Sequence, residues 1–130
     1  MKSALELSDA HISFIDLWEG NATIFFSHAY IHKSKGRPGR DAGEVFSQGA
    51  ELVLYDVTVY GSLPSLPNTI SAGILEVGGI KHESLPLPFR RKTPAVLSLE
   101  FVDGTALAIA GRKPRLELIG RPIFLEAFDQ

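Results

Sequence analysis

Apolar and polar residues alternate over most of the chain, in short runs that Gly, Pro, Asn and Asp residues separate. Alternation with a period of two residues is typical of a β-strand that buries one face and exposes the other. The pattern predicts about nine or ten short strands, which cover residues 4–8, 12–18, 22–33, 52–60, 69–77, 80–83, 95–102, 105–110, 116–119 and 123–128.

Three short turns predict hairpins between neighbouring strands. They are formed by Glu19-Gly20-Asn21, by Gly78-Gly79 and by Asp103-Gly104. Gly and Asn adopt the positive φ angles that two-residue hairpin turns require, and Asp-Gly between alternating runs is among the strongest hairpin signals. Hairpins join antiparallel strands, so the sheet is predicted to be antiparallel.

One short helix is predicted at about residues 42–48. Asp41 and Glu44 have the spacing of a helix capping box, and Gly49 is placed to end the helix. The chain lacks the regular succession of strands and helices that a parallel sheet requires. We therefore expect a single all-β domain over residues 1–130, an antiparallel β-sandwich or β-barrel with at most one short helix.

The clearest strand, residues 52–60, carries a single carboxylate at Asp56. A lone buried carboxylate is costly, so Asp56 is expected to be paired, solvent-facing or functional. We favour the solvent-facing interpretation. It places one alternating set on the outer face of this strand: Leu52, Leu54, Asp56, Thr58 and Tyr60.

Composition narrows the class of protein. Of the 130 residues, 45% are hydrophobic and 22% are charged, which is the balance of a packed soluble domain. The absence of cysteine excludes disulfide scaffolds, thiolate metal sites and cysteine nucleophiles. Acidic residues at Glu6 and Asp9 interrupt the first residues before a secretion signal can form, and no apolar run is long enough for a membrane-spanning helix. We expect a cytoplasmic protein with no membrane partner.

The sequence motifs of common catalytic and nucleotide-binding sites are missing. The chain has no nucleophile elbow, no phosphate-binding P-loop, no zinc-protease helix and no dinucleotide-binding glycine motif. We expect no cofactor, and a non-enzymatic role is favoured over an enzymatic one.

Histidine and tyrosine residues on the strand at 22–33 are the candidates for a ligand site. His28, Tyr30 and His32 are expected on one face together with Ile24 and Phe26. Four residues of strand span about 13 Å, too far for His28 and His32 to bind one zinc ion, so we expect no metal site. A small-molecule carrier or minor enzyme would instead use a pocket at the mouth of a barrel, lined by Trp18, Phe26, His28, Tyr30, His32 and Tyr60.

Basic residues gather in three groups, which hold 11 of the 13 lysines and arginines. The groups are Lys33, Lys35, Arg37 and Arg40; Arg90, Arg91 and Lys92; and Arg112, Lys113, Arg115 and Arg121. If they converge in the fold, they form a cationic surface for an acidic protein or another anionic partner. The net charge of -2 and the lone neighbouring aromatic residue, Phe89, argue against nucleic acid.

The leading hypothesis is a non-enzymatic binding module that presents the first two basic groups to an acidic macromolecular partner. A third hypothesis is a homodimer formed through an exposed edge strand. The segment 105–110 is short and uncharged, which makes it the candidate edge.

Overall fold

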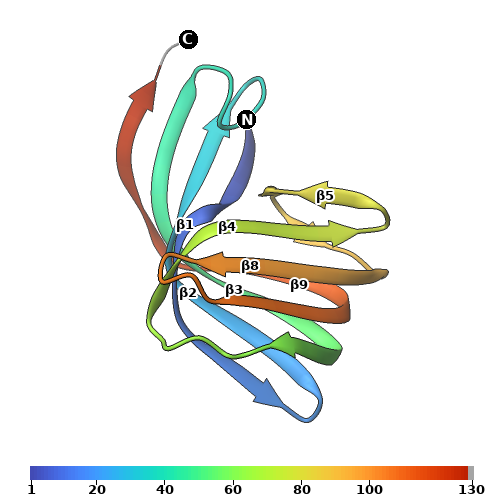
Figure 1. The fold of residues 1–130 in the computed structure, drawn as a ribbon. Coiled ribbons are helices and arrows are strands. Elements are labelled where there is room, and N and C mark those ends of the chain that lie inside the picture. The colour runs from blue at the N-terminus through green and yellow to red at the C-terminus, as the bar shows by residue number, and fades with distance from the viewer. Residues whose placement is uncertain (129–130) are drawn as a thin grey trace.

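The computed structural model describes residues 1–128. None of these residues is helical, and nine strands form one antiparallel sheet (Figure 1). The strands are β1 (Lys2–Trp18), β2 (Asn21–Ser34), β3 (Gly43–Gly61), β4 (Asn68–Val77), β5 (Ile80–His82), β6 (Ser84–Pro86), β7 (Phe89–Arg90), β8 (Pro94–Phe101) and β9 (Ala106–Phe128). The prediction of an antiparallel all-β fold is confirmed.

Six of the strands close into a ring. The order β5-β4-β8-β9-β3-β2-β1-β6 is closed by a short pairing of β1 with β4, in which His11 lies opposite Thr69 and Ile12 opposite Asn68. Because this contact involves only two residue pairs, while β3 and β9 pair over most of their lengths, the ring is uneven. The fold is therefore a single curled sheet and not an even barrel.

Apolar side chains fill the inside of the ring. Along β8 the alternation is complete: Ala95, Leu97, Leu99 and Phe101 are buried, and the residues between them are exposed. Burying a large apolar side chain contributes about 2 kcal/mol, so the period-two pattern fixes which face turns inward. The largest fully buried side chains are those of Phe89, Phe101, Leu5, Leu7, Ile12, Ile24, Ile31, Leu52, Leu54, Ile70, Leu75 and Leu85.

Four strands continue beyond the ring, and each carries an irregularity in its pairing at about the same level. The pairing register shifts between Phe26 and Ala29 on β2 and between Ser47 and Gly49 on β3, with matching irregularities on β1 and β9. Bulges bend and twist a strand. Beyond them the four strands form what we call the upper extension, residues 2–6, 29–34, 43–48 and 123–128, which holds both ends of the described chain (Figure 1).

The bulge on β2 overturns one prediction about the histidines. Ile24 and Phe26 are buried before the bulge, whereas Ala29 and Ile31 are buried after it. The inward-facing set therefore changes from even to odd residue numbers. Tyr30 and His32 do not share a face with Ile24 and Phe26, and the expectation of one continuous polar face on this strand is wrong.

A second bulge corrects the prediction for β3. Leu52 and Leu54 are fully buried, so they do not belong to an outer face. Asp56 has a positive φ of 51° at a register shift, after which Val57 and Val59 pack against the core. Asp56 itself is solvent-facing, as predicted, and its carboxylate pairs with the Arg112 guanidinium at 3.1 Å.

The predicted helix at 42–48 is wrong, because β3 already begins at Gly43. The carboxylate of Asp41 caps no helix and instead accepts a hydrogen bond from the backbone N–H of Arg37 at 2.5 Å, closing the preceding loop. The hydroxyl of the buried Ser34 donates to the carbonyl oxygen of Ala42 at 2.7 Å. Residues 43–48 then pair with β2 on one side and with β9 on the other, which satisfies their backbone groups without a helix.

The predicted hairpins are confirmed, with one difference in turn type. Positive φ angles at Glu19, Gly20, Gly78 and Gly79 form the two-residue turns after β1 and β4. In the turn after β8, only Gly104 has a positive φ, and the carboxylate of the preceding aspartate accepts the backbone N–H of Thr105.

The expectation of an edge strand at 105–110 is wrong. Residues 106–110 of β9 pair with β8 on one side, and residues 107–110 pair with β3 on the other, so they lie inside the sheet. Residues 1–128 contain no helix long and apolar enough to cross a membrane.

Candidate functional site

The short strand β7 attaches the second basic group to β9. Phe89 is almost completely buried and lies opposite Leu116, and Arg90 lies opposite Arg115. The backbone N–H of Arg91 donates to the carbonyl oxygen of Pro114 at 3.0 Å. The chain then enters β8, whose first residue, Pro94, lies opposite Arg112 of β9. An apolar anchor and a backbone ladder therefore fix the position of the basic residues that follow.

The basic residues of this region line one cleft of about 420 Å³. Its walls are the side chains of Tyr55, Arg90, Arg91, Lys92, Lys113 and Arg115. They come from β3, from β7 with the connection that follows it, and from the bend in the middle of β9. We call this site the cationic cleft.

The bend in β9 places two of these cations. Lys113 has a positive φ of 53°, and its N–H donates to the carbonyl oxygen of Thr93 at 3.1 Å. Pro114 is buried behind it, while Lys113 and Arg115 flank the proline and line the cleft. A proline lacks an N–H, so it suits a position where the ladder is interrupted.

Few negative charges neutralise the cleft. Of the five basic side chains, only Arg115 lies within 4.0 Å of a carboxylate among residues 1–128, with its Nε 3.6 Å from Glu117. That Nε is buried and makes no hydrogen bond within residues 1–128. Neighbouring like charges repel each other, and a buried donor without an acceptor is costly. An anion in the cleft would reduce the repulsion between the basic side chains and would supply an acceptor for the Nε of Arg115.

The field of the cleft reaches a histidine behind it. The guanidinium of Arg91 lies 4.4 Å from the centre of the Phe89 ring, whose other neighbour is the His82 ring at 5.6 Å. The pKa of His82 is lowered from its ordinary value, first by burial and second by the positive charge of Arg91. The charge of Arg91 therefore acts on His82, although it lowers the pKa less than burial does.

The sole tryptophan lies near the same site. The Trp18 ring meets the Tyr55 ring edge to face at 6.4 Å, and its Nε1 donates to the hydroxyl of Thr23 at 2.9 Å. Trp18 does not line the cleft, but Tyr55, which does, contacts its ring. Its fluorescence is thus a natural signal for binding there.

The structure brings together two of the three basic groups. Arg90, Arg91 and Lys92 from the second group meet Lys113 and Arg115 from the third. The first group lies in the upper extension and its loop. Lys33 covers the Phe46 ring at 4.5 Å, the loop at 35–42 carries Lys35 and Arg37, and Arg40 lines a different, polar cleft with Glu6 and His32.

The six residues predicted for a barrel-mouth pocket are dispersed. Phe26 and His28 border a hollow of about 480 Å³ at the bulges, where His28 meets His11 edge to face at 4.5 Å. His32 lies 3.4 Å from Glu6 in the upper extension, beside Tyr30 on the same strand. Trp18 lies against Tyr55, and Tyr60 borders a separate concave surface. Within residues 1–128, no three His, Asp or Glu side chains are grouped for a metal ion.

Sequence reasoning missed three residues of the cationic cleft as site residues. Lys113 and Arg115 were recognised as basic but not assigned to a site, and Tyr55 received no role. The run Arg-Lys-Pro-Arg at 112–115 was the available signal, because a proline within a strand marks a position where the ladder is interrupted. Nothing in the sequence connects Tyr55 with these residues.

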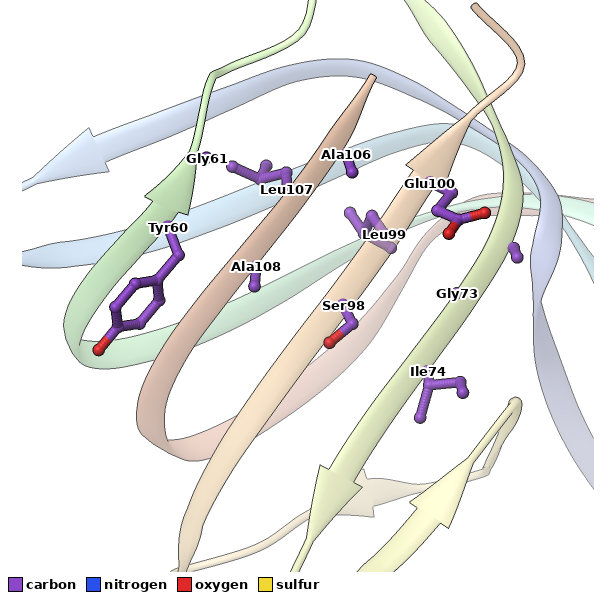
Figure 2. Close-up of a pocket in the computed structure, with 11 residues that line it drawn as sticks. Tyr60, Gly61, Gly73, Ile74, Ser98, Leu99, Glu100, Ala106, Leu107 and Ala108 are labelled. Atoms are coloured by element: carbon purple, nitrogen blue, oxygen red, sulfur yellow. The ribbon is translucent and has the colours of Figure 1, made fainter. Parts of the chain in front are cut away.

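A second concave surface lies on the outer face of the sheet. Ile74, Ser98, Ala108 and Tyr60 form one row across β4, β8, β9 and β3, and the small residues in its middle leave a groove of about 400 Å³ (Figure 2). Tyr60 stands at one side and Glu100 lies in the next row. We call it the apolar groove.

Comparison of the chain with models of protein families, with curated proteins and with solved structures found no match.

Proposed function

We propose that this protein is a non-enzymatic binding module that captures an acidic segment of a partner protein in the cationic cleft. One observation carries the proposal: five basic side chains line a single cleft, and a carboxylate pairs with only one of them among residues 1–128. The buried Nε of Arg115 adds a donor that finds no acceptor in the described part of the chain. Carboxylates of a partner supply both the charge and the acceptor.

An acidic peptide fits this cleft better than a nucleic acid does. Single-stranded nucleic acids bind where basic residues alternate with exposed aromatic rings on which the bases stack. Tyr55 is the only aromatic residue that lines the cleft, and Phe89 is buried beneath Arg91. The cleft therefore offers positive charge but no row of exposed aromatic rings on which bases could stack.

A charge-reversal experiment tests the proposal. A labelled oligo-glutamate peptide is expected to bind the protein, with an affinity that falls as salt rises. The double variant Arg90→Glu with Lys92→Glu is expected to bind about tenfold more weakly or worse, because it replaces attraction by repulsion at two walls of the cleft. Fluorescence anisotropy measures the affinity, and NMR titration of His82 locates the peptide, which raises the His82 pKa by offsetting the charge of Arg91.

The matched control is Arg37→Glu with Arg40→Glu, which changes the net charge equally at a loop outside the cleft. This control is expected to retain most of the affinity. Equal losses from both double variants would show that net charge alone attracts the peptide, and would contradict the proposal. Tighter binding of an oligonucleotide of the same charge would contradict the choice of an acidic peptide.

The apolar groove supports a second candidate, the binding of a small apolar molecule. Its floor is made of small residues, and the exposed Tyr60 provides an aromatic wall. The uncharged dye Nile red is expected to become fluorescent with the protein, and Tyr60→Ala is expected to reduce that signal severalfold because aromatic rings supply most of the contact area. Ile80→Ala, at a similarly exposed residue on β5, is the control. An unchanged signal from the Tyr60 variant would remove the groove as the binding site.

A further inference from the structure

The last part of β9 forms a free edge of the sheet. Residues 106–112 of this strand pair with β8, and residues 115–116 pair with β7. From Glu117 to Phe128 the strand pairs on one side only, with β3. Within residues 1–128 no backbone segment pairs with its other side, and Figure 1 shows this stretch, in red, at the margin of the upper extension. We call it the β9 edge.

Apolar side chains are concentrated along this edge. Of the fourteen large hydrophobic residues that the described chain exposes, five lie here: Leu118, Ile119, Ile123, Phe124 and Leu125. Natural proteins protect an open strand with lysines or other charges that discourage pairing. The β9 edge has no lysine; over its twelve residues its charged side chains are those of Glu117, Arg121 and Glu126, and it holds one proline, Pro122. It combines unpaired backbone groups with an apolar surface, which is the arrangement of a strand that pairs with another strand.

We propose that the occupant of the β9 edge is the same edge of a second copy of this chain, paired antiparallel about a two-fold axis. The reason is charge complementarity within one short segment. The apolar run Pro122–Leu125 has Arg121 before it and Glu126 after it. Leu125 is an extra residue in the ladder, because Phe124 and Glu126 pair with consecutive residues of β3, so Ile123 lies midway between Arg121 and Glu126 in ladder positions. When this segment lies antiparallel to itself about Ile123, Arg121 of each copy comes to the level of Glu126 of the other. A parallel arrangement would bring like charges together.

Such a contact is isologous, which is the form of most protein dimers. The two sheets join into one continuous sheet across the axis, and the apolar side chains of the two edges cover each other. The cationic cleft lies toward the middle of β9, at Lys113 and Arg115, outside the paired stretch. Dimer formation therefore leaves both clefts open, and the inference does not depend on what the clefts bind.

Sedimentation analysis of the full chain tests this inference. We expect a monomer–dimer equilibrium between low micromolar and several hundred micromolar protein. Ile123→Lys places two lysines against each other at the axis and is expected to weaken the dimer by about tenfold or more. Ile80→Lys is the matched control, since both isoleucines are exposed, at 63% and 61%, and Ile80 lies on β5. The control is expected to dimerise like the unmodified chain, and circular dichroism verifies that both variants are folded.

The absence of cysteine allows a second, geometric test. Ile123→Cys introduces the only thiol, and under mild oxidation it is expected to form a disulfide-linked dimer, because residues near a two-fold axis of paired strands bring their β-carbons within disulfide distance. Ile80→Cys is expected to remain monomeric under the same conditions. A monomer at all concentrations, or a dimer that Ile123→Lys leaves intact, would overturn the inference. Binding of a different protein to the β9 edge of a monomeric chain would overturn it as well.

Discussion

Replacing Phe89 with alanine is expected to lower the free energy of unfolding by about 3–5 kcal/mol, because truncating a buried phenylalanine removes its apolar contacts and leaves a cavity. Phe89 is 1% exposed and is one of the largest side chains in the core. Small domains have a total stability of about 5–15 kcal/mol, so this loss removes a large part of it. Urea unfolding followed by Trp18 fluorescence measures the change.

The same substitution tests whether the core positions the cationic cleft. Phe89 is the apolar anchor of β7, and Arg91 rests on its ring at 4.4 Å. Below the unfolding transition, Phe89→Ala is therefore also expected to weaken binding of the acidic peptide. Phe89→Leu fills most of the space, so a smaller stability loss and nearly unchanged peptide binding are expected. A loss below about 1 kcal/mol for the alanine variant would show that the ring is not an anchor.

Replacing Gly43 with alanine is expected to cost about 2–3 kcal/mol, because the new methyl group overlaps another part of the main chain. A Cβ at this position meets the carbonyl oxygen of Lys33 on the neighbouring strand. β3 pairs with β2 and with β9 at this point, so neither strand can move away without breaking its ladder. Thermal unfolding is expected to shift down by about 10 °C.

The control for this prediction is Gly20→Asn, in the turn between β1 and β2. Gly20 has a φ of 79°, and within residues 1–128 no atom other than those of its chain neighbours lies within 4 Å of a Cβ built there. Asn tolerates this conformation better than most residues, so a cost below about 1 kcal/mol is expected. Equal costs at the two glycines would mean that loss of glycine flexibility, and not steric overlap, explains the effect at Gly43.

Most of the strands and turns were predictable because their causes are local. Side chains in a strand alternate between two faces, so β8 could be recognised from its own residues, and Gly78-Gly79 has the backbone freedom that its turn requires. The helix prediction at 42–48 failed for the opposite reason. A capping pattern was present, but the hydrogen bonds that β2 and β9 offer to residues 43–48 were not visible in the sequence.

The candidate site was predictable only in part. The three basic groups are clear in the sequence, and the second of them lies in the cationic cleft. Which groups meet depends on the register between β7 and the bend of β9, which are about 25 residues apart. Tyr55 joins the site only because β3 is the other neighbour of β9, a long-range pairing that no local pattern contains.

The residue pattern of the chain was enough to establish an antiparallel all-β domain, the positions of most of its strands and turns, and the gathering of its positive charge into a few groups. The three-dimensional fold was needed to show where the bulges change the buried face, as at His28 and Asp56, which basic groups share a cleft, and that a free edge lies at 117–128 and not at 105–110. The physical reason is the range of the interactions. Alternation and turn geometry act between neighbours in the chain, whereas register, bulges and edges depend on hydrogen bonds between distant strands.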